Sequence, residues 1–304
     1  MFFWIAITIF AHLLNAIVFI IDKHLVSKTV LRPIVYAFYS SIFQFVYLIL
    51  IPFGFIVPEN KYIAACLFTG ILFTFILAVF YKAMQAAEST RVIPVVGGLT
   101  PVFTFFIAYL FIGERLGLNQ SIAFIIFILG GFLLSFKFNR ERSRVIKGIG
   151  WAVLAAFLFA VYYTLMKYIF LHVDFLSGFI TIQFGSFAGA LILLLFSKNR
   201  KSIVGSVKTD KAARKETVYL FISNKLLGAL AGFLIPYAIS LEGSSVTMIN
   251  SLQAVQYVFL LIFAVILSKK FPLFLKEQIG ERIIKRKIAA IILIGLGLLV
   301  ISWA

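Results

Sequence analysis

Ten apolar segments, each of a length that can cross a membrane, follow one another along the chain and leave little sequence for anything else. Their predicted ranges are 2–21, 33–57, 62–84, 91–112, 118–136, 148–170, 175–196, 217–240, 245–267 and 287–304. About 20 apolar residues in a helix cover the ~30 Å hydrocarbon core of a bilayer. The ~10-residue alternation of barrel strands is not visible in the sequence. The sequence therefore predicts an all-α polytopic membrane protein with ten transmembrane helices.

The composition supports this class, because only 13% of the residues are charged and 62% are hydrophobic, whereas about a quarter of a soluble domain is charged. The net charge of +17 would suggest nucleic acid as a partner of a soluble protein. Here the excess lysine and arginine fall between the spans, so we expect anionic membrane lipids and no nucleic acid. The first segment lacks the basic start of a signal peptide and is expected to be a retained helix.

The distribution of basic residues predicts the orientation of the chain. The loops after the odd-numbered spans hold 24 of the 28 lysines and arginines, while the opposite loops hold only Lys61, Arg115 and Lys167. By the positive-inside rule the basic loops are cytoplasmic. Ten spans place both termini on one side, so both are expected outside. The predicted location is the plasma (inner) membrane.

A repeated motif indicates two copies of one unit. Gly113-Glu114-Arg115 ends the fourth span, and Gly280-Glu281-Arg282 stands ahead of the last one. We therefore predict two five-helix repeats, over 1–143 and 144–304. Five spans are an odd number, so the two repeats must insert with opposite orientation. Inverted repeats are typical of secondary transporters, whose sites lie at the repeat interface near the membrane midplane.

Lys225 is the most informative polar residue, since it lies roughly three residues, or ~5 Å, from the centre of its predicted span. A charge at this depth is costly and must face water or an acidic partner. It either binds an anionic group of a substrate or forms a structural ion pair.

Two further spans carry polar residues at helical spacing. Thr247, Asn250, Gln253 and Tyr257 share one face of the ninth span, where they either line a substrate path or bond neighbouring helices. His12, Asn15 and Asp22 share one face of the first span. His12 and Asp22 are candidates for a proton relay. The alternatives are a packing role for His12 and an interfacial carboxylate for Asp22.

Other residues have weaker signals. Tyr81 and Tyr163 suit amphipathic organic solutes. Pro94 and Pro101 either form a gate or only bend the fourth span. Glu114 and Glu281 are expected to be structural, as an ion-pair partner or a helix cap. The fifth and tenth spans are almost wholly apolar, and their glycines suggest a possible homodimer face through small-residue packing.

Several kinds of chemistry have no motif in this sequence. It contains no GxxxxGK[ST] phosphate loop, no HExxH zinc motif and no G-x-S-x-G elbow. Cys66 is the only cysteine, so no internal disulfide can form. We expect no catalytic residues, no metal and no cofactor, and therefore no enzyme.

The junction of the third and fourth spans carries a family resemblance. Ala87-Glu88-Ser89-Thr90-Arg91-Val92 is followed by Pro94 and Pro101 and then by Gly113-Glu114-Arg115-Leu116. This pattern resembles the EamA-type transporters of the drug/metabolite transporter superfamily. The resemblance implies a ten-helix secondary carrier around a central cavity, with amino acids, metabolites or drugs as substrates. Members usually have cytoplasmic termini, in contrast to the orientation that the loop charges predict.

The functional hypothesis is an exporter of a small amphipathic metabolite that works by alternating access. Lys225 is expected to bind an anionic group such as a carboxylate. Asn15, Asn250 and Gln253 would make polar contacts, and Tyr81, Tyr163 and Tyr257 would stack on the solute or hydrogen-bond to it. The alternatives are a flippase for lipids or lipid-linked sugars, a non-transporting membrane subunit and an intramembrane enzyme.

Overall fold

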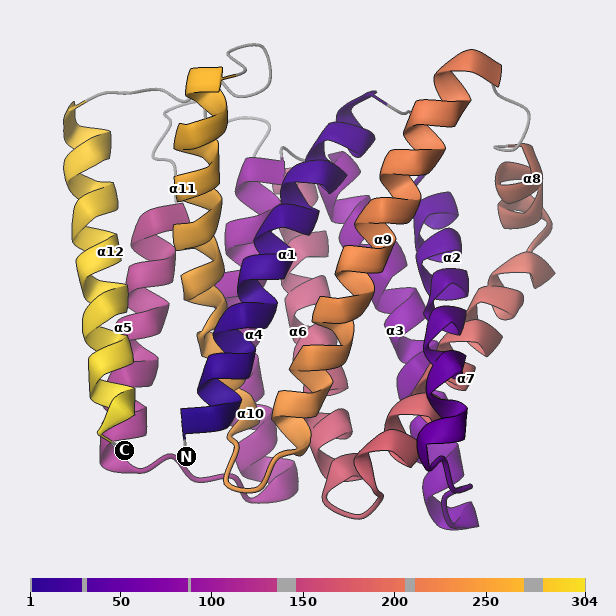
Figure 1. Ribbon diagram of the computed structural model, residues 1–304, viewed down its shortest axis with the longest axis horizontal. Coiled ribbons are helices and arrows are strands. Elements are labelled where there is room, and N and C mark those ends of the chain that lie inside the picture. The colour runs from indigo at the N-terminus through magenta and orange to yellow at the C-terminus, as the bar shows by residue number, and fades with distance from the viewer. Residues whose placement is uncertain are drawn as a thin grey trace.

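The computed structural model describes residues 2–28, 32–86, 89–135, 146–205, 211–270 and 281–303, and these ranges contain helices and no strand. The helices are α1 (Phe2–Lys28), α2 (Pro33–Phe43), the 3₁₀ helix η1 (Gln44–Phe53), α3 (Asn60–Ala86), α4 (Ser89–Ile112), α5 (Leu118–Ser135), α6 (Ile146–Phe170), α7 (Phe175–Leu195), α8 (Ser197–Gly205), α9 (Lys211–Ser240), α10 (Val246–Ser251), α11 (Gln253–Lys270) and α12 (Glu281–Ser302). They stand side by side in one bundle (Figure 1).

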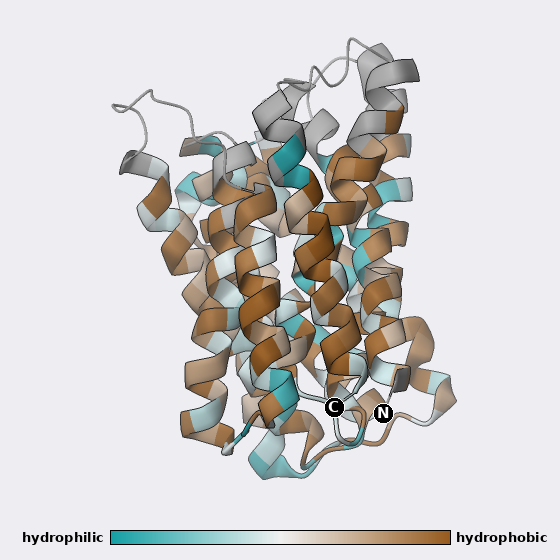
Figure 2. Ribbon diagram, turned by 90° about the vertical axis from the view of Figure 1, so that its left-hand side faces the viewer, coloured by the Kyte–Doolittle hydropathy of each residue, from teal (hydrophilic) through white to brown (hydrophobic). Residues whose placement is uncertain are grey.

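Eight segments of the described chain are long and apolar enough to cross a membrane, and two of these combine neighbouring helices. Pro33–Phe53 joins α2 to η1, and Val246–Phe263 joins α10 to α11. Two shorter apolar helices cover Leu118–Leu134 and Lys287–Ser302. The side of the bundle shown in Figure 2 is hydrophobic along most of its length. Helices can cross lipid because they satisfy their backbone hydrogen bonds internally. With these apolar spans, the protein is an all-helical, multi-pass membrane protein.

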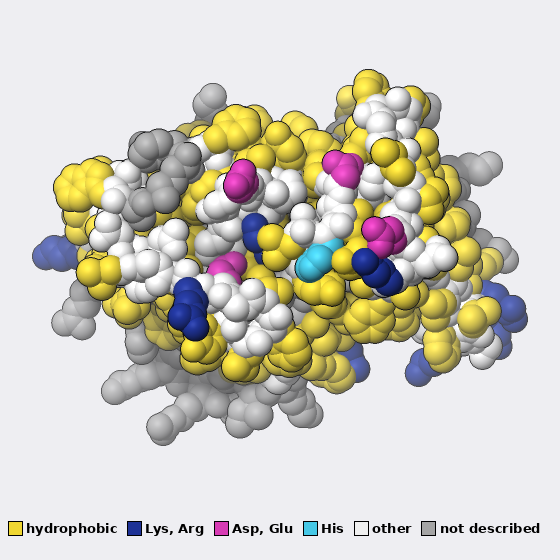
Figure 3. Space-filling view, turned by 90° about the horizontal axis from the view of Figure 1, so that it is seen from below, with side chains coloured by type: hydrophobic (Ala, Val, Ile, Leu, Met, Phe, Trp, Pro, Cys, Tyr) yellow, Lys and Arg dark blue, Asp and Glu magenta, His cyan; other side chains and the backbone are white. Residues whose placement is uncertain are grey.

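Both ends of the chain lie at the same end of the bundle (Figure 1). The turns 54–59, 113–117, 171–174 and 241–245 lie at this end too, and Arg115 is the only lysine or arginine in them. Seen from below, this surface shows a few charged side chains among many apolar ones (Figure 3). Each predicted basic loop begins at a helix end on the opposite side.

Several spans differ in detail from the predicted ranges, and α9 and α12 each begin six residues before the predicted start. The second predicted span, 33–57, changes from α-helix to 3₁₀ helix at Gln44 and ends at Phe53, where Gly54 adopts a left-handed conformation with φ 117°. The ninth, 245–267, is not one helix, because a turn at Leu252 separates α10 from α11. The first runs seven residues past 21, to Lys28. In addition, α8 forms where the sequence predicted only a basic loop.

The helices α3 and α7 meet backbone to backbone at Gly70 and Gly185. A Cβ on Gly70 would collide with the Ile182 carbonyl, and one on Gly185 would collide with the Leu67 carbonyl. Small residues allow this approach in membrane proteins, where lipid-facing surface gives helices little hydrophobic drive to associate.

Three glycines of α5 and α12 pack within the chain, whereas a Cβ on Gly295 would meet nothing within 4 Å. Gly130 faces Ile294, and Gly297 faces Phe127, so that α5 and α12 cover one another at one edge of the bundle. Gly131 packs against Ala254 of α11. The homodimer stays a prediction, and Gly295 with the outward residues Ile125, Leu129, Ile292 and Leu296 is the surface open to it.

Candidate functional site

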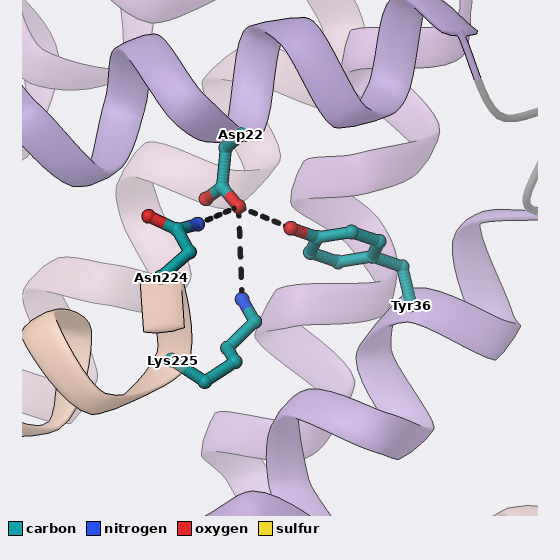
Figure 4. A network of polar contacts seen from close by, with 4 residues as sticks. All are labelled: Asp22, Tyr36, Asn224 and Lys225. Carbon is teal, nitrogen blue, oxygen red and sulfur yellow. Dashed lines mark hydrogen bonds and ion pairs between the residues drawn. The ribbon is translucent and has the colours of Figure 1, made fainter. Parts of the chain in front are cut away.

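A buried polar cluster joins α1, α2 and α9 and contains Lys225. We call Asp22, Tyr36, Asn224 and Lys225 the Asp22 cluster (Figure 4). Asp22 belongs to it because α1 continues to Lys28, so the carboxylate lies within the helix and not at its end as the sequence suggested. We expected Lys225 to face either water or an acidic partner, and the structure places it beside an acidic partner, Asp22.

One oxygen of Asp22 collects all the contacts of the cluster. Tyr36 donates its hydroxyl hydrogen bond to Asp22 Oδ1, and Asn224 Nδ2 donates to the same oxygen at 2.6 Å. The Lys225 Nζ lies 3.8 Å from it, and the two charged side chains keep only 12% (Lys225) and 21% (Asp22) of their exposure. The ion pair is therefore buried, and it is longer than a charge-assisted hydrogen bond.

Aromatic rings complete the surroundings of the Lys225 ammonium. It lies 4.6 Å from the centre of the Tyr36 ring and 5.3 Å from that of Phe221. Tyr81 of α3 meets Tyr36 edge to face, with the ring centres 4.5 Å apart. Ring faces attract a cation and add to the pull of the carboxylate. The carboxylate and the rings thus attract the ammonium without accepting hydrogen bonds from its N–H groups.

The cluster has unused hydrogen-bonding capacity. An ammonium has three N–H donors, yet Lys225 makes no hydrogen bond to any residue that the structure describes. The Asn224 Oδ1 atom is buried and also lacks a partner in this part of the chain. Since buried polar atoms are normally paired, an ammonium and an amide oxygen in this state can receive a polar ligand.

The polar stripe of the ninth span faces α4. Asn250 Nδ2 donates to Thr104 Oγ1 at 3.2 Å, and the Tyr257 hydroxyl donates to the Ile93 carbonyl at 3.1 Å. Gly97 provides the space for this approach, because a Cβ there would collide with the Tyr257 hydroxyl and lie 3.1 Å from Gln253 Nε2. We call these contacts of Asn250, Gln253 and Tyr257 with α4 the α4 seam. It lies in the interior of the bundle, as the spacing predicted.

The turn between α10 and α11 lies within the same seam. Val255 N bonds the Leu252 carbonyl at 2.9 Å in place of the ordinary α-helical partner, and Ser251 Oγ bonds the Met248 carbonyl at 2.8 Å. Asn250 and Gln253 stand on either side of this interruption. Breaks in transmembrane helices are tolerated where the backbone is buried in protein or lines a cavity.

His12 contacts α10 and α11 and does not belong to the Asp22 cluster. Its Nδ1 lies 3.2 Å from Gln256 Oε1, and its Nε2 lies 3.5 Å from the Ile249 carbonyl. It is ten residues from Asp22 on the same helix, which corresponds to ~15 Å of rise. The structure therefore does not bring the two proposed relay residues together.

The remaining predicted residues lie elsewhere on the same helices. Pro94 and Pro101 are inside α4, which continues through both, and the side chain of Pro94 lies outside the described set. Pro101 is buried. Asn15 is half-buried on α1, and no described residue hydrogen-bonds its side chain. Tyr163 of α6 stacks near Phe159, with 6.2 Å between ring centres.

Glu114 caps a helix, which is one of the two structural roles expected for it. Its carboxylate accepts hydrogen bonds from Ser245 Oγ at 2.9 Å and from the backbone N–H groups of Val246 at 3.0 Å and Thr247 at 3.1 Å. These groups form the start of α10, where the positive end of the helix dipole favours a carboxylate. The corresponding Glu281 side chain lies outside the described residues.

The comparisons decide what kind of protein this bundle is. Residues 2–136 match the sequence profile of the EamA-like transporter family. This half of the chain belongs to that family. With its apolar helices, the protein is a membrane transporter of the drug/metabolite type. No match was found among the curated proteins.

The fold likeness extends beyond the EamA-like half. A solved structure described only as "Crystal structure of protein" superposes with a TM-score of 0.67 over 97% of this chain and 96% of its own, at 16% sequence identity. An identity this low shows likeness of fold alone. The EamA-like half contributes Asp22, Tyr36 and Tyr81 to the site, whereas Lys225 and Asn250 lie outside the matched range.

Sequence reasoning missed two members of the Asp22 cluster. They are Tyr36 and Asn224, which the spacing of polar residues within the spans did not assign to a site. The adjacency of an amide to a membrane lysine was the one available signal for Asn224. No group of His, Cys, Asp and Glu side chains that could hold a metal occurs in the described part of the chain.

Proposed function

We propose that the protein is a secondary carrier of small amphipathic solutes that bear a carboxylate, with Lys225 as the group that binds the carboxylate. The observation that carries this proposal is the Lys225 ammonium itself, which is buried, 3.8 Å from its only described counter-charge and without a hydrogen-bond acceptor among the described residues. A solute carboxylate supplies the missing acceptors through charge-assisted hydrogen bonds. Tyr36, Tyr81 and Phe221 supply ring surface for the apolar part of the solute.

The carrier contains ten transmembrane helices in two inverted five-helix repeats, 1–143 and 144–304. The eight long spans support a multi-pass arrangement, and we count the shorter apolar helices Leu118–Leu134 and Lys287–Ser302 as the two further crossings. The position of both chain ends at one end of the bundle supports an even number of crossings.

Alternating access needs contacts between the two repeats that can break on one side at a time. The Asp22 cluster joins α1 and α2 of the first repeat to α9 of the second, toward the end with the basic loops. The bonds of Glu114 to Ser245, Val246 and Thr247 join the repeats at the end with the termini. We propose that these two sets of contacts open in turn.

The loop charges support an orientation with the basic loops in the cytoplasm and the termini outside. In this orientation the Asp22 cluster lies nearer the cytoplasmic side, where a metabolite made in the cell arrives. A metabolite that accumulates in the cytoplasm then moves outward, so the physiological direction is export.

Efflux counterflow in proteoliposomes tests the function directly. The purified full-length protein is assayed with radiolabelled L-phenylalanine and N-acetyl-L-phenylalanine, which carry a carboxylate, and with phenethylamine, which lacks one. The expected result is counterflow of the two carboxylates and none of the amine. Lys225→Met should reduce the carboxylate rates at least tenfold, whereas Lys61→Met, at an exposed lysine, should leave them unchanged. Equal rates in wild type and Lys225→Met would remove Lys225 from the site.

A further inference from the structure

The Asp22 cluster is electrically neutral as it stands. The described titratable or charged groups that face Asp22 are Tyr36 of α2, Tyr81 of α3 and Lys225 of α9, and only Lys225 is a cation. Lys23 and His24 follow Asp22 on α1, and their side chains lie outside the described set. One carboxylate and one ammonium therefore share a buried space with no second counter-charge in the described surroundings.

A solute carboxylate that binds Lys225 changes this balance. Two carboxylates would then face one ammonium, and an uncompensated charge in a buried site is strongly unfavourable. The charge can be cancelled in two ways. The solute can bring a positive group of its own, or one of the carboxylates can take up a proton.

Of the two carboxylates, Asp22 loses less interaction with Lys225 when it takes up a proton. It lies 3.8 Å from the ammonium, beyond hydrogen-bond distance, whereas a mobile solute can approach the free N–H groups of Lys225 closely. A neutral Asp22 carboxyl still accepts the hydrogen bond of Asn224, which now measures 2.6 Å. Its new O–H can donate to the solute carboxylate.

We propose that Asp22 is the proton-carrying group of the transport cycle and that the charge of the solute sets the number of protons moved. This inference rests on the proposed function. A monoanionic solute replaces Asp22 as the counter-charge of Lys225. Asp22 then binds one proton from the water phase to which the site is open. A zwitterion places its carboxylate on Lys225 and its ammonium on Asp22, and no proton is needed.

The charges balance at every step. The empty site contains Asp22⁻ and Lys225⁺, and the site loaded with a monoanion contains neutral Asp22, Lys225⁺ and the solute carboxylate. On the far side the solute leaves, Asp22 releases its proton to water, and the ion pair forms again. No net charge crosses the membrane in either half-cycle, so the membrane potential does not drive the movement of a monoanion. Each exported monoanion takes one proton out with it, so the concentration gradient of the solute drives export.

The test measures proton and solute fluxes together in proteoliposomes that contain the full-length protein and a pH-sensitive dye. The probes are N-acetyl-L-phenylalanine, a monoanion at neutral pH, and L-phenylalanine, its zwitterionic counterpart. The expected result is one proton carried inward with each N-acetyl-L-phenylalanine and none with L-phenylalanine. A potassium diffusion potential set with valinomycin should change neither rate.

Asp22→Asn provides the decisive variant. It keeps acceptors for Asn224 and Tyr36, so counterflow of N-acetyl-L-phenylalanine should persist and show that the variant is folded. Its proton flux should vanish, and its net uptake should become sensitive to membrane potential because the empty site now carries the charge of Lys225. Glu59→Gln neutralises an exposed carboxylate and should keep the proton-to-solute ratio of the wild type.

Each outcome decides between the two claims. Movement of N-acetyl-L-phenylalanine by the wild type without protons, or an undiminished proton flux in Asp22→Asn, would overturn the inference and leave the carrier function standing. A proton accompanying L-phenylalanine would overturn it too. If the wild type moves neither solute, the proposed function itself fails.

Discussion

The Asp22 carboxylate and the Lys225 ammonium lie 3.8 Å apart inside the bundle, although one belongs to the first helix of the chain and the other to α9. This contact joins the EamA-like half to the remainder of the chain. It also places the only described cation of the site where a solute can compete for it. Stability and transport should therefore respond to both residues together.

A double-mutant cycle measures this coupling. Lys225→Met leaves the buried Asp22 carboxylate without its counter-charge and should lower the free energy of unfolding by about 1–3 kcal/mol. Adding Asp22→Asn to that variant removes the orphan charge and should recover part of the loss. Thermal denaturation in detergent gives the four values. Strictly additive effects would mean that the two groups do not interact.

Gly97 and Gly98 provide a matched pair in α4. Ala at Gly97 places a Cβ against the Tyr257 hydroxyl and should destabilise the protein by about 1–3 kcal/mol, as overpacking does. Ala at Gly98 meets nothing within 4 Å and should be neutral or stabilise by up to ~1 kcal/mol, because helical Ala loses less entropy than Gly. Equal melting temperatures for the two variants would contradict the packing of α4 against α11.

The cap on α10 predicts an effect at Glu114. Glu114→Ala removes the acceptor of three hydrogen bonds and should cost about 1–2 kcal/mol, which is the usual range for a lost N-terminal cap. Glu114→Gln keeps an acceptor but loses the charge that favours the helix dipole, so its cost should be smaller. The same thermal denaturation assay compares the variants. If Glu114→Gln destabilised the protein as much as Glu114→Ala, the charge of Glu114, and not its hydrogen bonds, would be the source of the stability.

Cysteine labelling tests the orientation. Cys66 is buried, so it should not react in the folded protein and need not be replaced, but for the same reason it cannot report the orientation itself. A cysteine introduced at the exposed Glu242, in a turn at the end with the termini, should react with a membrane-impermeant maleimide added to intact cells. Reaction only after the cells are opened would place the termini in the cytoplasm, as is usual for the family.

Much of the fold follows from the sequence because hydrophobic length decides which segments can cross a membrane. The apolar segments and the inward polar face of the ninth span were predicted on this basis. The turn at Leu252 was not, because no proline or glycine marks it and the break depends on local bonds such as that of Ser251 to the Met248 carbonyl.

The site was only partly predictable. Lys225 could be found because a charge in a transmembrane segment is rare and costly. Its pairing with Asp22 depends on how far α1 extends and on which helix packs beside α9, and neither is encoded in local spacing. Helical spacing placed His12 and Asp22 on one face of the first span. In the bundle, however, His12 contacts Gln256, and Asp22 accepts a hydrogen bond from Asn224.

The most direct test of the account is an experimental structure of the full-length protein with bound N-acetyl-4-bromo-L-phenylalanine, whose bromine identifies the orientation of the solute. The account predicts the solute carboxylate within hydrogen-bond distance of Lys225 Nζ and the bromophenyl ring against Tyr36, Tyr81 or Phe221. A carboxylate bound at Lys167 or along the α4 seam, with the Asp22–Lys225 pair undisturbed, would contradict it.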